Sequence, residues 1–234
     1  MVEFFQLSTA ERLEALDLAA NTSGLLPHLL NWTLFRRFPL STAAMPALRR
    51  LAADTGETVS LGIRVGWYCV RVAVAFGGND IYHRDRLGEA NLLHRHLSAR
   101  PILAQLTGPE IDQYRRFVAL HHRSTALELD RGRLKKELRL ARERGFAVEE
   151  LSVSPGSCAV SVPVHDGAGR PIASITVNGP VLACPAGSES IEPPRWLAVR
   201  DALEATIRAG GEAYRPRYGH IDPDRIVIRL AGAD

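Results

Sequence analysis

The histidines His94 and His96 come closest in this sequence of 234 residues to the spacing of a metal site. Two residues apart, they would share one face of a strand, but the pattern around them favours a helix, on which positions i and i+2 diverge. The sequence has no H-x-x-x-H or H-E-x-x-H motif, which would set two histidines on one helical face. We therefore expect no metal and no cofactor, and we expect the neighbours His121 and His122 to be solvated.

A nucleophile or a general base would be the other route to catalysis. Cys158 lies in an expected strand without a histidine near it in the sequence, so its thiol should pack as a small hydrophobe. Glu149 could act as a general base, or it could be solvated in a loop between a helix and a strand. No orienting partner accompanies either residue, so an enzyme that uses Glu149 as its base on a small molecule is the least favoured function.

Binding chemistry is better supported, by the stretch ITVN at residues 175–178. On a strand, Thr176 and Asn178 share one face while Ile175 and Val177 take the other. Two short polar side chains beside each other on a sheet can hold a carboxylate or a hydroxyl by hydrogen bonds. Two interpretations stay open: the hairpin that contains them is one wall of a ligand pocket, or it is scaffold whose polar side chains face solvent.

The elements that would position these residues follow from the hydrophobic period. A period of 3.6 predicts a helix that is capped by Ser41 or Thr42 and ended by Gly56, whereas residues 57–76 indicate two strands joined at 65–67. A third strand is expected over 80–86, and a hairpin over 158–165 and 171–178. Further helices are expected over 93–106, from Thr107 or Gly108 to 120, from a cap at Asp130 to Gly145, and over 194–208.

This order of elements is that of an α+β domain with an antiparallel sheet and helices on one or both sides. The 29 basic and 26 acidic residues leave a net charge of +3, too small an excess to indicate nucleic-acid binding. The most hydrophobic run, residues 62–78, carries Arg64 and Arg71, which argues against a membrane span. The three cysteines at irregular spacings predict neither a disulfide framework nor a zinc site, and they fit a reducing cytoplasm.

From about Arg36 to residue 210 the chain resembles the effector-binding domain of IclR-type bacterial transcription regulators. Four segments carry the resemblance in the family's order: PALRRLAADTGETVSLGIRVG, RLGEANLLHRHLSARPILAQLTGPEI, LKKELRLARERGFAV and PGSCAVSVPVHDGAGRPIASITVNGP. The family fold is a curved antiparallel sheet flanked by helices, akin to GAF domains, which agrees with the α+β prediction. The resemblance implies a ligand sensor in transcription regulation that forms homo-oligomers, dimers or tetramers, and not an enzyme.

The family's pocket positions, carried over to this sequence, make up the expected ligand-binding site: Leu97, Ser98, Ala99, Glu149, Cys158, Ala159, Thr176 and Asn178. The chain departs from the family in four places. Ala99 and Arg100 replace the usual Gly-Lys, Glu149 replaces an aspartate, and Thr176 and Asn178 replace two serines. The family's hairpin cysteine falls on Ala159, and the cysteine of this chain, Cys158, comes one place early. The ligand implied is a small organic molecule such as a carboxylate or an aromatic metabolite.

The resemblance also divides the chain into an N-terminal helical segment (1–35), an effector-binding domain (36–210) and a C-terminal extension (211–234). About 35 residues before Arg36 are too few for the family's winged helix-turn-helix, so we expect the protein to reach DNA only through a partner. The apolar segment with Trp32 and Phe35 is a candidate contact for that partner. The alternative function is an oligomerisation or interaction module that has kept the fold and lost the pocket.

Overall fold

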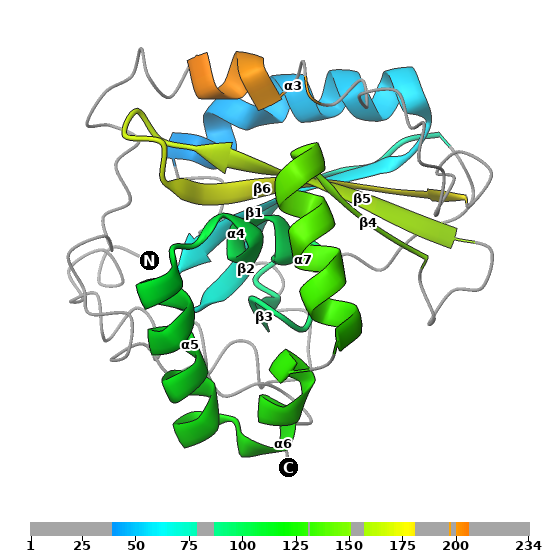
Figure 1. Cartoon of the computed structure of the whole chain (residues 1–234). Coiled ribbons are helices and arrows are strands. Elements are labelled where there is room, and N and C mark those ends of the chain that lie inside the picture. The colour runs from blue at the N-terminus through cyan, green and yellow to red at the C-terminus, as the bar shows by residue number, and fades with distance from the viewer. Residues whose placement is uncertain are drawn as a thin grey trace, which may run out of the picture.

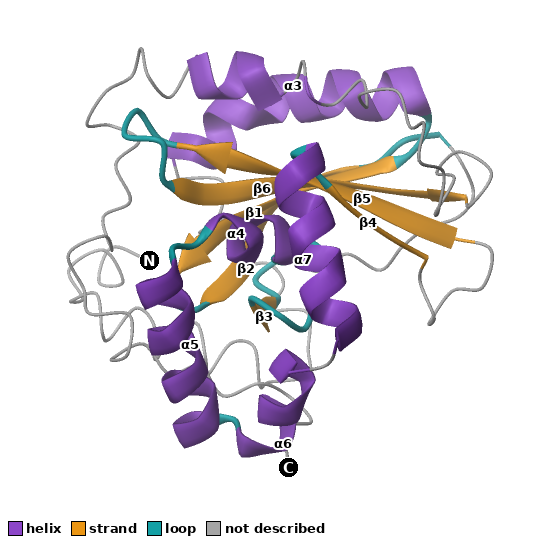
Figure 2. Ribbon diagram, in the orientation of Figure 1, coloured by secondary structure: helices purple, strands orange, loops and turns teal. Residues whose placement is uncertain are grey.

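A single antiparallel sheet with helices on both faces forms the body of the protein (Figures 1 and 2). The computed structural model describes residues 39–78, 87–130, 132–150, 157–180, 197 and 200–205. Six strands run in the order β3-β2-β1-β6-β5-β4, and every neighbouring pair is antiparallel. The predicted α+β class with an antiparallel sheet is confirmed.

The strands are β1 (Thr58–Val65), β2 (Tyr68–Ala75), β3 (Ala90–Leu92), β4 (Ala147–Glu150), β5 (Ser157–His165) and β6 (Pro171–Pro180). The helices are α3 (Pro39–Thr55), α4 (Arg100–Gln105), α5 (Gly108–His121), α6 (Arg123–Ala126) and α7 (Gly132–Arg144), with a 3-10 turn, η2 (Leu127–Asp130). Residues 200–205 are helical and fall inside the expected last helix.

Helix α3 covers one face of the sheet, the upper face in Figure 1. Its apolar residues Ala44, Leu48 and Leu51 are buried in the core together with Val59 and Leu61 of β1. Burial of one leucine side chain stabilises the fold by about 1.5–3 kcal/mol, so this face holds the domain together. Ser41 and Thr42 already lie inside this helix, so the predicted cap at Ser41 or Thr42 is wrong.

Three glycines with positive φ end elements where the sequence predicted them to end. Gly56, at φ 76°, follows α3, and Gly145, at φ 79°, follows α7. Gly169, at φ 74°, lies in the turn of the β5–β6 hairpin, where the Asp166 carboxylate accepts hydrogen bonds from the backbone N–H groups of Ala168 and Arg170, both at 2.9 Å. Such conformations cost a glycine little, so the turns are set locally.

The stretch before α4 differs from its prediction. A helix over 93–106 was expected, but residues 93–99 form turns and the helix runs only over Arg100–Gln105. Pro101 explains the late start, since proline belongs in a first helical turn and not in a helix interior. The short strands β3 and β4 were not predicted. The expected strand over 80–86, the N-terminal segment 1–35 with Trp32 and Phe35, and the extension 211–234 lie outside the described residues.

Among the described residues, no helix combines the length and the apolar composition that crossing a membrane requires.

Candidate ligand-binding site

The sheet face opposite α3 is lined by buried polar side chains. They lie on three neighbouring strands and are at most 5% exposed: Thr58 and Ser60 on β1, Ser161 on β5, and Ser174, Thr176 and Asn178 on β6. Their alternation with apolar residues is the expected period of two. Thr176 and Asn178 therefore share one face as predicted, and they are buried and do not face solvent.

Strand register aligns three of the expected site residues in one row across the sheet. Glu149 on β4 lies opposite Ala159 on β5, Ala159 lies opposite Asn178 on β6, and Asn178 lies opposite Thr58 on β1. Thr176 belongs to the next row, between Ser161 and Ser60. Residues from distant parts of the sequence thus form one continuous surface.

The turn of residues 97–99 lies on this surface. The backbone carbonyl of Ser98 accepts a hydrogen bond from the Ser174 hydroxyl, and the Ser161 hydroxyl lies 3.5 Å from the same carbonyl oxygen. Leu97 packs in a small apolar cluster with Ala159 of the sheet and Ala141 of α7. Ala99 is fully buried at the start of α4. The structure therefore brings Leu97, Ser98 and Ala99 against the strands that carry the other expected site residues.

Arg100 forms two ion pairs at the edge of this surface. Its Nη1 atom lies 3.1 Å from Oε2 of Glu137 on α7 and 3.0 Å from Oε1 of Glu149 on β4. The Nε atom of Arg100 is buried without a hydrogen-bond partner. A small pocket next to these ion pairs is lined by Leu97, Arg100, Glu137, Ala141 and Ala147, among others. Glu149 therefore belongs to a strand and an ion pair, and the solvated-loop interpretation is wrong.

Cys158 is the one expected site residue that the structure separates from the others. It precedes Ala159 on β5, and successive strand residues point to opposite faces, so Cys158 turns away from Leu97 and Ser98. It is also disulfide-bonded, whereas Cys69 is a free buried thiol. The prediction that the cysteines form no disulfide is wrong for Cys158, because irregular spacing in the sequence does not measure distance in the fold.

The histidines of the turn diverge to different partners. Nδ1 of His94 lies 2.6 Å from the Tyr114 hydroxyl, and Nδ1 of His96 lies 2.8 Å from the Ser98 hydroxyl. Among the described residues, no group of three or more His, Cys, Asp or Glu side chains could hold a metal ion. His122, which was expected to be solvated, is instead buried and lies 2.8 Å from the Tyr68 hydroxyl.

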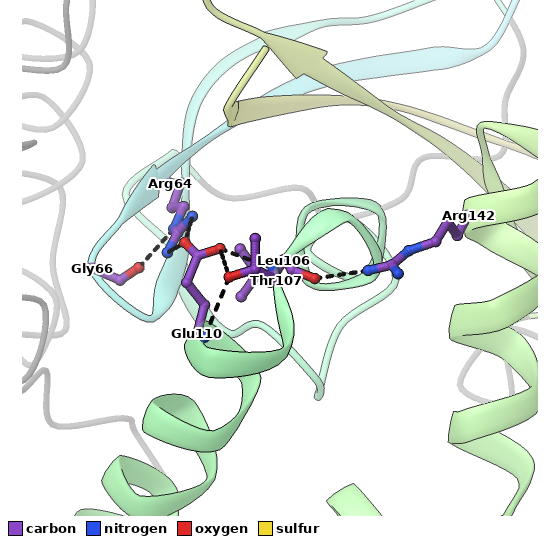
Figure 3. Close-up of polar contacts among 6 residues, drawn as sticks. All are labelled: Arg64, Gly66, Leu106, Thr107, Glu110 and Arg142. Atoms are coloured by element: carbon purple, nitrogen blue, oxygen red, sulfur yellow. Dashed lines mark hydrogen bonds and ion pairs between the residues drawn. The ribbon is translucent and has the colours of Figure 1, made fainter. Parts of the chain in front are cut away.

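Ionic and capping contacts fix the segment that follows the turn (Figure 3). Arg142 of α7 donates to the backbone carbonyls of Ala104 and Leu106, at 2.6 and 2.7 Å, so it caps the C-terminal end of α4. Thr107 and Glu110 form a capping box at the start of α5, and Glu110 also pairs with Arg64 at 3.3 Å. These contacts tie α4 to α7 and tie α5 to the end of β1, and the capping box confirms the predicted start of α5.

Ser161, Ser174 and Cys69 are site neighbours that sequence reasoning did not single out. Ser174 alternates with Thr176 and Asn178, so extending the same period of two by one step would have included it. Ser161 and Cys69 become neighbours only through long-range strand pairing and the position of the turn, and no local signal indicates them.

Comparisons with known proteins identify the family to which this domain is similar. Residues 33–187 match the family described as "Bacterial transcriptional regulator IclR C-terminal". The HTH-type transcriptional regulator BhcR of Paracoccus denitrificans is 31% identical over 182 residues, which cover 78% of this chain and 63% of BhcR. The HTH-type transcriptional repressor AllR of Escherichia coli K12 is 27% identical over 139 residues, 59% of this chain and 51% of AllR. The chain thus spans between half and two thirds of these relatives.

Solved structures show the same fold. The Thermotoga maritima IclR aligns with a TM-score of 0.56 at 25% identity, covering 82% of this chain and 73% of that one. An IclR family regulator from Brucella abortus aligns with a TM-score of 0.61 at 19% identity, covering 76% and 67%. HmgR of Pseudomonas aeruginosa aligns with a TM-score of 0.59 at 22% identity, covering 76% and 70%.

Proposed function

The chain belongs to the IclR family of bacterial transcriptional regulators, and we propose that its C-terminal domain senses a small organic molecule bound on the polar sheet face beneath residues 97–99. It is a regulator and not an enzyme. The ligand proposed is a small carboxylate or an aromatic metabolite, and no cofactor takes part.

The buried polar face is the observation that carries this proposal. A buried hydroxyl or amide needs a hydrogen-bond partner, and an apolar sheet face would pack without that requirement. Six such side chains nevertheless line adjacent strands, while α3 packs on an ordinary apolar face. A surface that only held the domain together would not need them, whereas a surface that binds a polar ligand would.

Every expected residue except Cys158 has a role in this proposal. Thr176 and Asn178 would bond the polar groups of the ligand, and Leu97 with Ala159 would contact its apolar part. Glu149 would accept hydrogen bonds at the end of the row that contains Asn178, while Arg100 holds its carboxylate in place. Ser98 and Ala99 would cover the ligand through their backbone. Cys158 has no direct role, because it faces the other side of the sheet.

Thermal unfolding of the purified chain against a panel of small carboxylates and aromatic metabolites tests the proposal. A ligand at one hundred times its dissociation constant adds about 2.7 kcal/mol of stability. A reproducible rise of the unfolding temperature for one chemical class supports a working sensor. A panel that leaves the unfolding temperature of the folded protein unchanged contradicts it.

A module that oligomerises without a ligand is the second candidate. It is favoured by one observation, which is that the Ser174 hydroxyl already has a partner within the chain, the Ser98 carbonyl. The double substitution Thr176→Val and Asn178→Leu separates the two candidates. In a sensor the double substitution should abolish ligand binding. In a module it should leave the association of the chain with its protein partner, or with other copies of itself, intact.

Assembly and DNA contact belong to the proposal as well. We expect homo-oligomers in solution, which sedimentation velocity would detect, and an indirect action on DNA from the cytoplasm through a partner. Specific binding of the purified chain to duplex DNA at physiological salt would contradict the indirect route.

A further inference from the structure

We propose that the ligand site contains a subsite for an oxygen acceptor, built by Cys69, Ser161 and Ser174. In this structure the backbone carbonyl of Ser98 occupies the subsite. A ligand that bears a carbonyl or carboxylate oxygen takes the place of that carbonyl and displaces the turn of residues 97–99. The inference rests on the proposed ligand-sensing function and names the chemistry that the site selects.

Three side chains from three strands converge on the Ser98 carbonyl. The Ser174 hydroxyl of β6 donates the shortest hydrogen bond to it. The Ser161 hydroxyl of β5 lies 3.5 Å from the carbonyl oxygen, and the Cys69 sulfur of β2 lies 4.0 Å from it. All four residues are buried. The arrangement therefore encloses one oxygen atom with donors on several sides.

The available protons fit this arrangement. A hydroxyl or thiol has one proton to donate, and Ser174 uses its proton on the Ser98 carbonyl. The Thr176 hydroxyl lies 3.0 Å from that of Ser161, so Thr176 can donate to Ser161. The single Ser161 proton is then shared between the Ile175 carbonyl, at 3.3 Å, and the Ser98 carbonyl, at 3.5 Å. Burial raises the pKa of the Cys69 thiol, which therefore keeps its proton at neutral pH. Each member of the subsite can act as a donor, so an acceptor suits it and an ammonium group does not.

Gly62 on β1 gives independent support, because its missing side chain makes room for the thiol. A Cβ atom at this position would lie 2.4 Å from the Cys69 sulfur and 3.4 Å from the Ser174 hydroxyl. Glycine weakens a strand interior unless a close approach requires it. Here the close approach is that of Cys69 to the polar face, so Gly62 admits the thiol to the subsite.

The Ser98 carbonyl is suited to replacement because it stands apart from the backbone bonds of its turn. The carbonyls of His96, Leu97 and Ala99 each accept a backbone N–H, whereas the Ser98 carbonyl is turned to the sheet and accepts from side chains. Exchange of this carbonyl for a ligand oxygen keeps the donors of the subsite satisfied, and the released carbonyl can bond to water.

The first test needs no ligand. Hydrogen exchange of the full chain measures the amides of Ala99 and Arg100, which bond within the turn. Ser174→Ala removes the shortest bond to the Ser98 carbonyl and should speed this exchange at least about threefold. Ser60→Ala is the matched control, since Ser60 is as buried on the same face but is not one of the three donors. Unchanged exchange in Ser174→Ala would overturn the occupied subsite.

The second test uses probes that differ in the acceptor. Three trios have one carbon skeleton each: propionate, propionamide and propylamine; benzoate, benzamide and benzylamine; phenylacetate, phenylacetamide and phenethylamine. Acids or amides should raise the unfolding temperature, whereas the matched amines should not, and the neutral amides separate acceptor chemistry from charge. Affinity for the best acceptor should fall at least about fivefold in Ser174→Ala and stay within about twofold in Ser41→Ala, which changes a buried serine of α3 on the other side of the sheet.

The outcomes separate this inference from the function on which it rests. If an amine stabilises the protein as well as its acid and amide, or Ser174→Ala binds with unchanged affinity, ligand sensing stands and the acceptor subsite is wrong. If none of the nine probes changes the unfolding temperature, the sensing function itself is contradicted, while the exchange experiment still decides whether the Ser98 carbonyl is held by Ser174.

Discussion

The Nη1 atom of Arg100 lies 3.0 Å from the Glu149 carboxylate, so the first residue of α4 is tied to β4, the strand at one edge of the sheet. The same nitrogen lies 3.1 Å from Glu137 of α7. Arg100 follows directly after the turn of residues 97–99 and is only 14% exposed in its side chain. The position of that turn over the polar face therefore depends on this pair of ionic contacts.

Replacement of Arg100 by methionine should destabilise the domain by about 1–3 kcal/mol, because two partly buried carboxylates lose their shared cation. Urea denaturation of the two proteins measures the change. Arg139→Met is the control, since Arg139 is an exposed arginine of α7 outside these contacts. Equal stabilities of Arg100→Met and the wild type would contradict the structural role of the pair.

Substitution of Gly62 by alanine should cost about 1–3 kcal/mol through overpacking, because the new Cβ would lie 2.4 Å from the Cys69 sulfur. The second substitution Cys69→Ala removes that sulfur and should restore a large part of the loss. Thermal and urea unfolding of the two single variants and the double variant form a complete cycle. Additive losses in the double variant would show that Gly62 does not make room for Cys69.

The capping box at Thr107 should contribute about 1 kcal/mol to stability. Thr107→Ala removes the side-chain acceptor for the Glu110 backbone N–H, whereas Thr107→Ser keeps a hydroxyl there. We expect urea unfolding to show the loss in the alanine variant and nearly wild-type stability in the serine variant. Equal losses in both variants would show that the Thr107 hydroxyl does not cap α5 at the junction drawn in Figure 3.

Stability should fall in mild acid because of His122. Burial lowers the pKa of His122, and the neighbouring His121 and Arg95 act in the same direction. Since the folded pKa lies below the unfolded value of about 6.5, the unfolded chain binds the proton first as the pH falls. The contribution of His122 is therefore present above pH 6.5 and is lost as the pH decreases towards the folded pKa.

Urea unfolding of the wild type and His122→Gln between pH 8 and pH 5 checks this dependence. The variant should lose less stability than the wild type over that range, because it has no imidazole to protonate. Parallel curves for the two proteins would show that the Tyr68–His122 contact does not couple folding to pH.

Local signals in the sequence were sufficient for the hairpins and for α5. Alternating apolar residues predicted β1, β2, β5 and β6, and the expected start of α5 at Thr107 or Gly108 agrees with the capping box that the structure shows at Thr107. The face shared by Thr176 and Asn178 followed from the same alternation. These features depend on neighbours within one or two turns of chain, which the sequence displays directly.

The features that sequence reasoning missed depend on distant partners. His122 is buried by Tyr68, which lies 54 positions away, and Glu149 belongs to a four-residue strand that forms only by pairing with β5. The disulfide of Cys158 has no signature in the cysteine spacing. The period of two along β5 puts the side chains of Cys158 and Ala159 on opposite faces of the sheet, so the orientation of Cys158 could be predicted from the sequence. The assignment of Cys158 to the site rested on the family pattern and not on this alternation.

The most direct test of the central claim is a calorimetric titration with the compound that raises the unfolding temperature most. The wild type is compared with the double variant Thr176→Val, Asn178→Leu, after circular dichroism has shown that the variant is folded. We predict that the dissociation constant rises at least about tenfold in the variant, which corresponds to about 1.4 kcal/mol of lost hydrogen bonding. Equal dissociation constants for the two folded proteins would contradict the assignment of the polar sheet face as the ligand site.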